Sequence, residues 1–320
     1  MKILITGGTG LIGSALIQHL LHVRHSCSFI VLTRQSLPST SRVHYVNHLH
    51  DIASDTKIDA VVNLAGEPIA DKKWNQQRKL NLADSRIKFT ACLVEWLAER
   101  TYAPEVLISG SAVGWYGDQK DTVVSEATDA RVEYTHYLCQ AWEQAALAAQ
   151  KLSTRVCLLR TGLVLAPKGG FLEKMLPPFR FGLGGRLGDG SQYMPWIHLD
   201  DIVAMIHFLI EHKECEGAFN ATAPQPVRNI DFTRALARAL GRPAIFPVPA
   251  WLLRMIFGEM SRLLLTGQNA IPEKFLQAGF TFFHNNLDAA LKSVLTIRGN
   301  KPVGSAHGCP GQHGIKGSSP

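Results

Sequence analysis

The chain has 320 residues, of which 46% are apolar and 18% charged, so it can form a substantial core and is not mostly disordered. Its formal net charge of +7 comes from scattered basic residues, which suit anionic small ligands as well as nucleic acid, and we expect no nucleic-acid partner. No apolar run reaches the ~20 residues that a membrane-spanning helix needs. We therefore expect a cytoplasmic protein without a membrane partner.

Cysteine and histidine, which often bind metals, follow no ligand pattern here. The six cysteines contain no CxxC pair, and in a chain of this size we expect reduced, mostly buried thiols. His19, His22 and His25 are spaced to share a helix face, but no carboxylate or cysteine completes the set. We predict no metal site.

Short apolar and β-branched runs alternate with longer segments of helical spacing along the first half of the chain. This alternation predicts right-handed crossovers and a parallel sheet, in an α/β fold that is doubly wound. The predicted strands are residues 2–6, 29–32, 43–46, 60–64, 106–109 and 156–159. The predicted helices are residues 11–21, 75–100 and 137–151.

The pattern changes after Leu165, where residues 167–195 are rich in glycine and proline. A short run at 196–198 then leads into a predicted helix, and its first residues, Asp200 and Asp201, suit a helix N-terminus. From Glu216 onward, short strands, turns and helices mix, which predicts a smaller mixed α/β C-terminal region. The last predicted helix is 286–295, and the Gly-, Ser- and Pro-rich residues 298–320 are expected to be a disordered tail.

The strongest motif is TGGTGLIG at residues 6–13, between the first predicted strand and the first predicted helix. Gly7 permits a tight turn, Gly10 lets the backbone approach a pyrophosphate, and Gly13 lets helix and strand pack closely. A plain strand–turn–helix is the alternative, but position and context agree with a dinucleotide-binding turn. We therefore predict a Rossmann-type sheet, with residues 1–168 as the NADP(H)-binding domain.

The preference for NADP(H) rests on the end of the second predicted strand, where Thr33 and Arg34 follow Leu32. An NAD site usually has a carboxylate here for the ribose hydroxyls, whereas a guanidinium suits a 2′-phosphate. The alternative is a solvated surface arginine. We expect residues 193–222 to return to this domain and the remainder of 169–297 to form the substrate side.

Further motifs occur in both halves of the chain. They are NLAG at 63–66, SGSA at 109–112, RTG at 160–162, WIHLDD at 196–201, GAFNATAP at 217–224, GE at 258–259, LLTGQ at 264–268 and GFTF at 279–282. Together with the glycine turn, they resemble the atypical and extended short-chain dehydrogenase/reductases, specifically the YfcH-type "epimerase family proteins", which are related to nucleotide-sugar epimerases. The resemblance covers about residues 1–297.

The resemblance implies a set of cofactor-binding residues. Arg86, which follows Ser85 on the long predicted helix, would reach the cofactor phosphates, and Asn81 lies one turn earlier. An exposed helix charge is the alternative for Arg86. The full set is Gly7, Thr9, Gly10, Leu11, Ile12, Gly13, Thr33, Arg34, Leu64, Ala65, Gly66, Asn81 and Arg86.

The catalytic residues depart from the family pattern. Active members use a serine, a tyrosine and a lysine four residues after the tyrosine; Ser111 and Tyr137 match the first two, but Ala141 replaces the lysine. Without the ammonium, an ordinary phenol of pKa ~10 is about 0.1% ionised at pH 7. Tyr137 is therefore either a catalyst or a packing residue. Glu143, which falls on another helix face, and His198 are weaker substitutes.

Two function classes follow. The first is an NADP(H)-dependent oxidoreductase or epimerase acting on a small hydroxyl- or carbonyl-bearing substrate, such as a nucleotide sugar, with Ser111 and Tyr137 as catalytic residues. The second is a catalytically silent NADP(H)-binding sensor or scaffold, which Ala141 favours. The partner is a small molecule in either case, and the sequence leaves a homodimer open.

Overall fold

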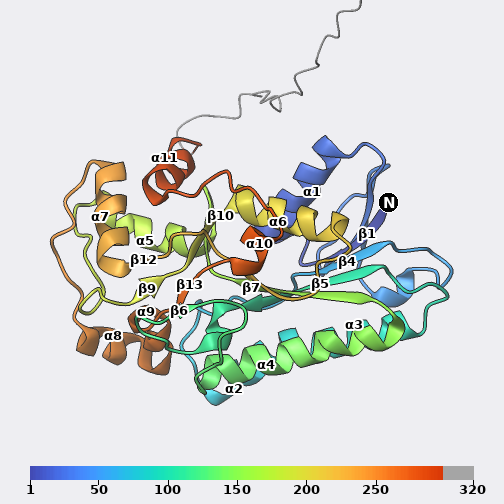
Figure 1. Ribbon diagram of the computed structural model, residues 1–320, viewed down its shortest axis with the longest axis horizontal. Coiled ribbons are helices and arrows are strands. Elements are labelled where there is room, and N and C mark those ends of the chain that lie inside the picture. Colours follow the sequence, from blue (N-terminus) through green and yellow to red (C-terminus); the bar gives the residue numbers. More distant parts are fainter. Residues whose placement is uncertain (298–320) are drawn as a thin grey trace, which may run out of the picture.

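The computed structural model describes residues 1–297 (Figure 1), and the predicted tail lies outside the described residues. Seven parallel strands form one sheet in the order β3-β2-β1-β4-β5-β7-β11. Their bounds are β1 Lys2–Thr6, β2 Ser28–Leu32, β3 Val43–Val46, β4 Ala60–Asn63, β5 Val106–Ala112, β7 Arg155–Thr161 and β11 Gly217–Ala221. The order reverses between β1 and β4, the point at which doubly wound sheets bind ligands. The predicted fold class is confirmed.

The sheet is the core of the molecule because its strands are apolar on both faces. Ile3, Leu4 and Ile5 of β1 are all fully buried, as expected for a parallel sheet covered by helices on each side. On one face lie α1 (Leu11–Val23) and α6 (Leu199–Glu211), as Figure 1 shows. The two helices pack side by side.

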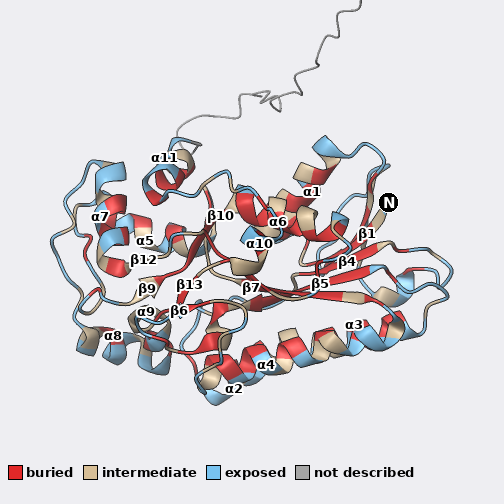
Figure 2. Ribbon diagram, viewed as in Figure 1, coloured by how far each residue is buried: buried red, intermediate tan, exposed pale blue. Residues whose placement is uncertain are grey.

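The other face is covered by α2 (Gln76–Ala83), α3 (Phe89–Ala98) and α4 (Tyr134–Leu147). Figure 2 shows their inner sides buried and their outer sides exposed. The single helix predicted over 75–100 is present, but the π-helical segment Asp84–Lys88 interrupts it between α2 and α3. Such segments insert an extra residue into a helix turn and occur often at functional sites.

The C-terminal half adds a smaller mixed region around a second core that contains Trp196 and Phe232. The helix α5 (Gly170–Arg180) lies in the glycine- and proline-rich stretch, for which the sequence predicts no helix. Its two internal prolines are atypical of a helix, although Leu172, Leu176 and Phe179 have helical spacing and are buried. The remaining strands are β6 Val123–Val124, β8 Leu163–Leu165, β9 Tyr193–Met194, β10 Trp196–His198, β12 Val227–Arg228 and β13 Asn269–Ala270. The remaining helices are α7 Asn229–Leu240, α8 Ala250–Phe257, α9 Arg262–Leu265, α10 Glu273–Gln277 and α11 Leu287–Ile297, with short 3-10 turns at Leu49–Asp51, Val113–Tyr116, Ala148–Leu152 and Gly258–Ser261.

Among residues 1–297, no helix is both long and apolar enough to cross a bilayer.

Two histidines meet where α1 packs on α6. Nε2 of His19 lies 3.2 Å from Nδ1 of His207, and burial lowers the pKa of His207 to about 4 and also lowers that of His19. Both rings are therefore neutral in the folded protein at pH 7. Protonation would place two cations in contact in a partly buried interface.

We predict that the free energy of unfolding falls as the pH drops from about 6.5 toward 4. A histidine whose folded pKa is below its unfolded value binds protons in the unfolded chain first, so stability is lost in that window. Urea denaturation at pH 7 and pH 5 measures it. His207→Gln should reduce the loss, whereas His25→Gln, at an exposed position, should not; an unchanged loss in His207→Gln contradicts the assignment.

Candidate active site

The glycine turn between β1 and α1 can exist only with glycine at two positions. Gly7 has φ +69°, and a Cβ there would lie 2.7 Å from the backbone of Leu64. A Cβ on Gly13 would lie 2.5 Å from the carbonyl oxygen of Gly7. These distances are impossible for a side chain, so the turn brings the N-terminus of α1 directly against the end of β4.

This helix N-terminus is open to an anion. Its cap, Gly10, offers no side-chain hydrogen bond, and the first turn of α1 contains no acidic residue. Thr9 and Gly10 are exposed, while Leu11 and Ile12 are partly buried. Uncapped amide groups and the positive end of the helix dipole together favour a phosphate.

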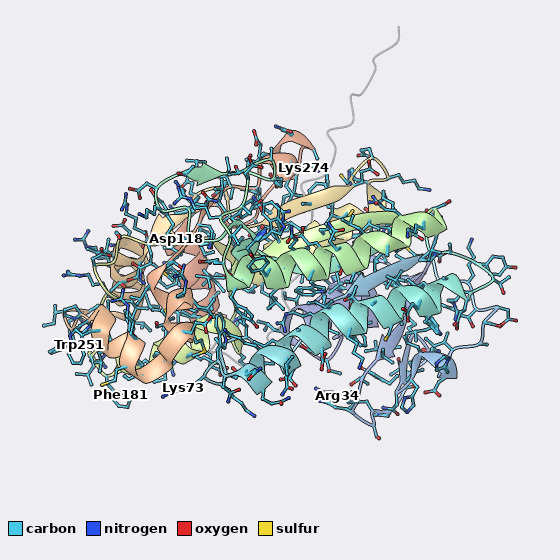
Figure 3. The ribbon with its side chains drawn as sticks, turned by 90° about the horizontal axis from the view of Figure 1, so that it is seen from below. Arg34, Lys73, Asp118, Phe181, Trp251 and Lys274 are labelled. Atoms are coloured by element: carbon cyan, nitrogen blue, oxygen red, sulfur yellow. The ribbon has the colours of Figure 1, made fainter. Side chains whose placement is uncertain are left out.

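Arg34 lies just beyond the end of β2. The Asn47 side chain donates a 2.8 Å hydrogen bond to the carbonyl of Thr33 and fixes this corner. Arg34 itself is exposed and extends from the edge of the molecule in Figure 3. Within residues 1–297, its guanidinium forms no hydrogen bond or ion pair and is free for a ligand.

The segment after β4 runs beside the glycine turn. The amides of Leu64 and Ala65 bond to the carbonyl and hydroxyl oxygens of Thr6, at 3.1 and 3.3 Å. A Cβ on Gly66 would lie 3.2 Å from the guanidinium carbon of Arg86, so the two are packed together. Arg86 donates to the carbonyl of Glu67 at 2.7 Å, and burial lowers its pKa.

Asn81 and Arg86, which we expected to bind the cofactor together, have different surroundings. Asn81 is exposed and accepts a 3.0 Å hydrogen bond from Gln77, on its own helix. Arg86 belongs to the π-helical segment and turns inward toward Gly66, with its guanidinium 5.3 Å from the centre of the Trp142 ring. The structure therefore places Arg86, but not Asn81, beside the segment after β4.

Ser111 is held by a buried ion pair. It lies near the end of β5, and its hydroxyl donates a 2.6 Å hydrogen bond to Glu143 of α4. The same carboxylate receives two bonds from Arg160 of β7, at 2.9 and 3.0 Å. Both charged side chains are only 5–6% exposed. Burial tends to lower the pKa of Arg160, but the hydrogen bonds and charge of Glu143 outweigh it and raise the pKa.

This network continues away from Ser111 toward β11. Arg160 donates to the Tyr116 hydroxyl at 3.0 Å, and that hydroxyl donates to the Asn220 side chain at 2.7 Å. The guanidinium also lies 3.6 Å from the centre of the Trp115 ring. Every polar atom of the guanidinium therefore has a partner, as a buried charge requires.

The two tyrosines near the start of α4 differ from each other. Tyr137 is 59% exposed, and Ala141 stands one helical turn beyond it. The Tyr134 ring packs on Trp74 at an interplanar angle of 62°, and its centre lies 4.5 Å from the Lys79 ammonium. Burial raises the pKa of Tyr134. No hydrogen bond links either phenol to Ser111.

His198 is a helix cap. Its Nδ1 accepts a 3.1 Å hydrogen bond from the Asp200 amide, while Asp200 and Asp201 lie in the first turn of α6, as predicted. The Asp201 carboxylate binds the amides of Phe283 and His284, at 2.7 and 3.0 Å. His198, Asp200 and His284 have side-chain nitrogen and oxygen atoms within 4.8 Å of one another, a cluster that sequence reasoning missed. Since His198 Nδ1 is already occupied, we do not assign a metal to it.

Sequence reasoning also missed how Glu143 and Arg160 act together. It placed Glu143 on a different helix face from Tyr137 and assigned Arg160 no role. A signal was present, since a charged residue that continues the apolar run 156–159 must have a buried partner. The sequence contained no indication of which acid that partner would be.

Comparison with known proteins places this chain in a family. Residues 3–221 match the model of the NAD dependent epimerase/dehydratase family, and residues 248–294 match a domain of unknown function, DUF1731. The chain belongs to the NAD dependent epimerase/dehydratase family. The predicted resemblance is thus confirmed, and its motifs were read in the correct family.

Relatives cover nearly the whole epimerase-family chain. It is 41% identical over 295 residues to an epimerase family protein of Mycobacterium leprae, with 91% of this chain and 95% of the relative covered. The crystal structure of human epimerase family protein SDR39U1 (isoform 2) with NADPH is 31% identical, with a TM-score of 0.84, and covers 93% of this chain and 100% of that one. UDP-glucuronic acid 4-epimerase from Bacillus cereus, in complex with UDP-glucuronic acid and NAD, is 19% identical at TM-score 0.73, over 92% and 98%. That likeness concerns the fold.

We predict that Glu143→Ala lowers the free energy of unfolding by about 3–5 kcal/mol, because Arg160 would remain buried without its counter-ion. Urea denaturation measures this loss. The matched control is Arg238→Ala, which removes the exposed pair with Asp288 and should cost less than about 1 kcal/mol. Similar losses in the two variants would show that the buried pair does not support the fold.

Proposed function

We propose that this chain binds NADP(H) along the carboxyl ends of β1, β2 and β4 and transfers a hydride between it and a small hydroxyl- or carbonyl-bearing substrate. One combination of features carries the proposal: the turn has no room for side chains at Gly7 and Gly13, and the helix that follows it has an uncapped N-terminus. The turn that Gly7 and Gly13 make possible would cradle the pyrophosphate. The NADPH named with the human relative supports the choice of cofactor.

The free guanidinium of Arg34 supports the 2′-phosphate form of the cofactor. In the proposed arrangement it binds this phosphate, and the corner held by Asn47 keeps the main chain in place. Leu64, Ala65 and Gly66 would line the adenosine side, and Arg86 would lie near the phosphates. When bound, the cofactor supplies or accepts the hydride.

The role of Ser111 follows from its donor bond. A carboxylate only accepts hydrogen bonds, so the Ser111 proton points to Glu143 and the oxygen keeps its lone pairs for a ligand. Ser111 would accordingly accept a hydrogen bond from a substrate hydroxyl and orient it. Tyr137, or a water molecule, would exchange the proton with solvent, since its phenol is exposed.

A second candidate is a catalytically silent NADP(H)-binding sensor or scaffold. Two observations favour it: Ala141 replaces the lysine of active relatives, and the Ser111 proton is already bound by Glu143. In this case, cofactor occupancy would be read by a partner while the cleft performs no turnover. For the first candidate, the enzyme, we propose nucleotide sugars as possible substrates and the cytoplasm as its location.

We predict that the protein binds NADPH more tightly than NADH. Arg34→Ala should weaken NADPH binding by about 1.5–3 kcal/mol, the value of a hydrogen bond to a charged group, and leave NADH binding unchanged. Calorimetric titration of wild type and variant with both nucleotides measures this. Arg234→Ala changes an exposed arginine of α7 and serves as the control. If neither nucleotide binds, the glycine turn is structural and both candidate functions fail.

If the protein is an enzyme, Ser111→Ala should abolish turnover and leave NADPH affinity nearly unchanged, because Ser111 would touch the substrate and not the phosphates. Loss of NADPH absorbance across a panel of small aldehydes and ketones, followed by the reverse reaction on the matching alcohols, measures turnover. Ser26→Ala alters an exposed serine and is the control. Equal activity in Ser111→Ala excludes the mechanism, whereas tight binding without wild-type turnover favours the sensor.

A further inference from the structure

Large apolar side chains are exposed together at the end of the molecule that carries α8. Their exposed fractions range from 42% to 81%. Single exposed apolar residues are ordinary, but a group on adjoining segments marks an interaction site. We name this group the α8 face; it consists of Phe181, Leu183, Ile245, Phe246, Trp251, Met255 and Ile256.

Backbone hydrogen bonds hold the segments of the α8 face side by side. The Phe246 amide bonds to the carbonyl of Gly184 at 3.1 Å, and the Val248 amide bonds to that of Arg186 at 2.9 Å. The helix α8 begins two residues later. Figure 3 shows Phe181 and Trp251 at the same outer end of the molecule in that view.

The helix α8 contributes its outer side to this face. Trp251 and Met255 are one turn apart and therefore point to the same side, and they are 65% and 66% exposed. Leu253, on the opposite side, is buried and attaches the helix to the body of the protein. The apolar outer side of α8 thus has no partner among residues 1–297.

Arginines predominate among the charges around the α8 face, although one exposed acid borders each of its two stretches, Asp189 and Glu259. Residues 180–188 and 241–258 contain no aspartate or glutamate, but they contain four exposed arginines: Arg180, Arg186, Arg242 and Arg254. Among the described residues, Arg180, Arg242 and Arg254 form no ion pair. Next to the face, a shallow hollow of about 420 Å³ is lined by three arginines of α7 and the turn after it, Arg234, Arg238 and Arg242. Arg234 and Arg238 pair with Asp231 and Asp288, so Arg242 carries the unpaired charge of the hollow.

We propose that the α8 face rests on the surface of a lipid bilayer that contains anionic phospholipids. Exposed aromatic and aliphatic side chains enter the boundary between headgroups and acyl chains, while arginines bind the phosphates above them. The arginine-lined hollow is placed to receive a headgroup. A second copy of the chain fits less well, since it would bring the arginines of one copy against those of the other, and the nearby Glu259 already pairs with Lys79.

This contact is compatible with the lack of a spanning helix among residues 1–297. The length argument used on the sequence concerns segments that cross the hydrocarbon core. A protein that lies on the surface needs only an apolar face and cations beside it. The expectation of no membrane partner therefore does not extend to this kind of contact.

Flotation of the full chain with vesicles tests the proposal. Vesicles of phosphatidylcholine alone should retain little protein, and vesicles that also contain phosphatidylserine should retain it in a salt-sensitive manner. The double variant Trp251→Ala/Met255→Ala should lose binding. Arg254→Gln should weaken it about fivefold, the effect of one arginine near an anionic surface.

Phe283→Ala is the matched control, because Phe283 is 70% exposed on the segment between α10 and α11, outside the α8 face. It should bind vesicles as the wild type does, and NADPH affinity should be equal in all variants. The proposal is overturned if the wild type does not bind anionic vesicles, or if the double variant binds them equally. A wild-type dimer that the double variant converts to monomer, without vesicle binding, would assign the face to self-association instead.

Discussion

The buried pair of Arg160 and Glu143 determines how the centre of this molecule is arranged. A guanidinium at the end of a central strand is tolerated only with a counter-ion and a hydrogen-bond partner for each of its three nitrogens. Glu143 meets this requirement from α4 and Tyr116 meets it from the turn after β5. The pair therefore fixes the position of α4 over β5 and β7, and with it the position of Ser111.

The same pair sets the charge next to the candidate site. In relatives with a catalytic lysine, an ammonium near the phenol stabilises its ionised form. Here the cation is matched by a carboxylate at 2.9 Å, so the pair adds no net positive charge, and Ala141 adds none. Ser111 is in turn limited to accepting hydrogen bonds. A substrate that presents a hydroxyl is thus better suited to this geometry than one that presents only a carbonyl oxygen.

The sequence predicts the fold well because the fold depends on local patterns. The β-branched runs and the glycine turn each contain their own information, and Gly7 and Gly13 are needed for contacts within the turn or to the adjacent strand. The site depends instead on distant pairings. Glu143 lies 32 residues from Ser111 and 17 from Arg160, and no local pattern selects it among the acids of the chain.

In two further places the structure differs from the sequence-based prediction, and the reason is again that local composition does not determine the outcome. The π-helical segment at Asp84–Lys88 turns Arg86 inward, and it cannot be seen in helical spacing because the residues around it keep ordinary helix composition. The role of Asp201 depends on a segment more than eighty residues later, whose amides it binds. Local composition correctly predicts a helix start there, but the cap is His198.

The C-terminal region is attached to the helices beside the candidate site by a limited contact. Around α8 and α9, this region contacts α2 and α4 through a small apolar cluster that includes Met260, Trp74 and Leu138. Two partly exposed ion pairs, Lys79 with Glu259 and Arg262 with Glu133, flank the cluster and contribute at most about 1 kcal/mol each. Separating this contact costs far less than opening the sheet, because the sheet buries its strands on both faces. The segment around α8 and α9 is therefore held less firmly than the sheet, while the pair of Arg160 and Glu143 keeps Ser111 in place.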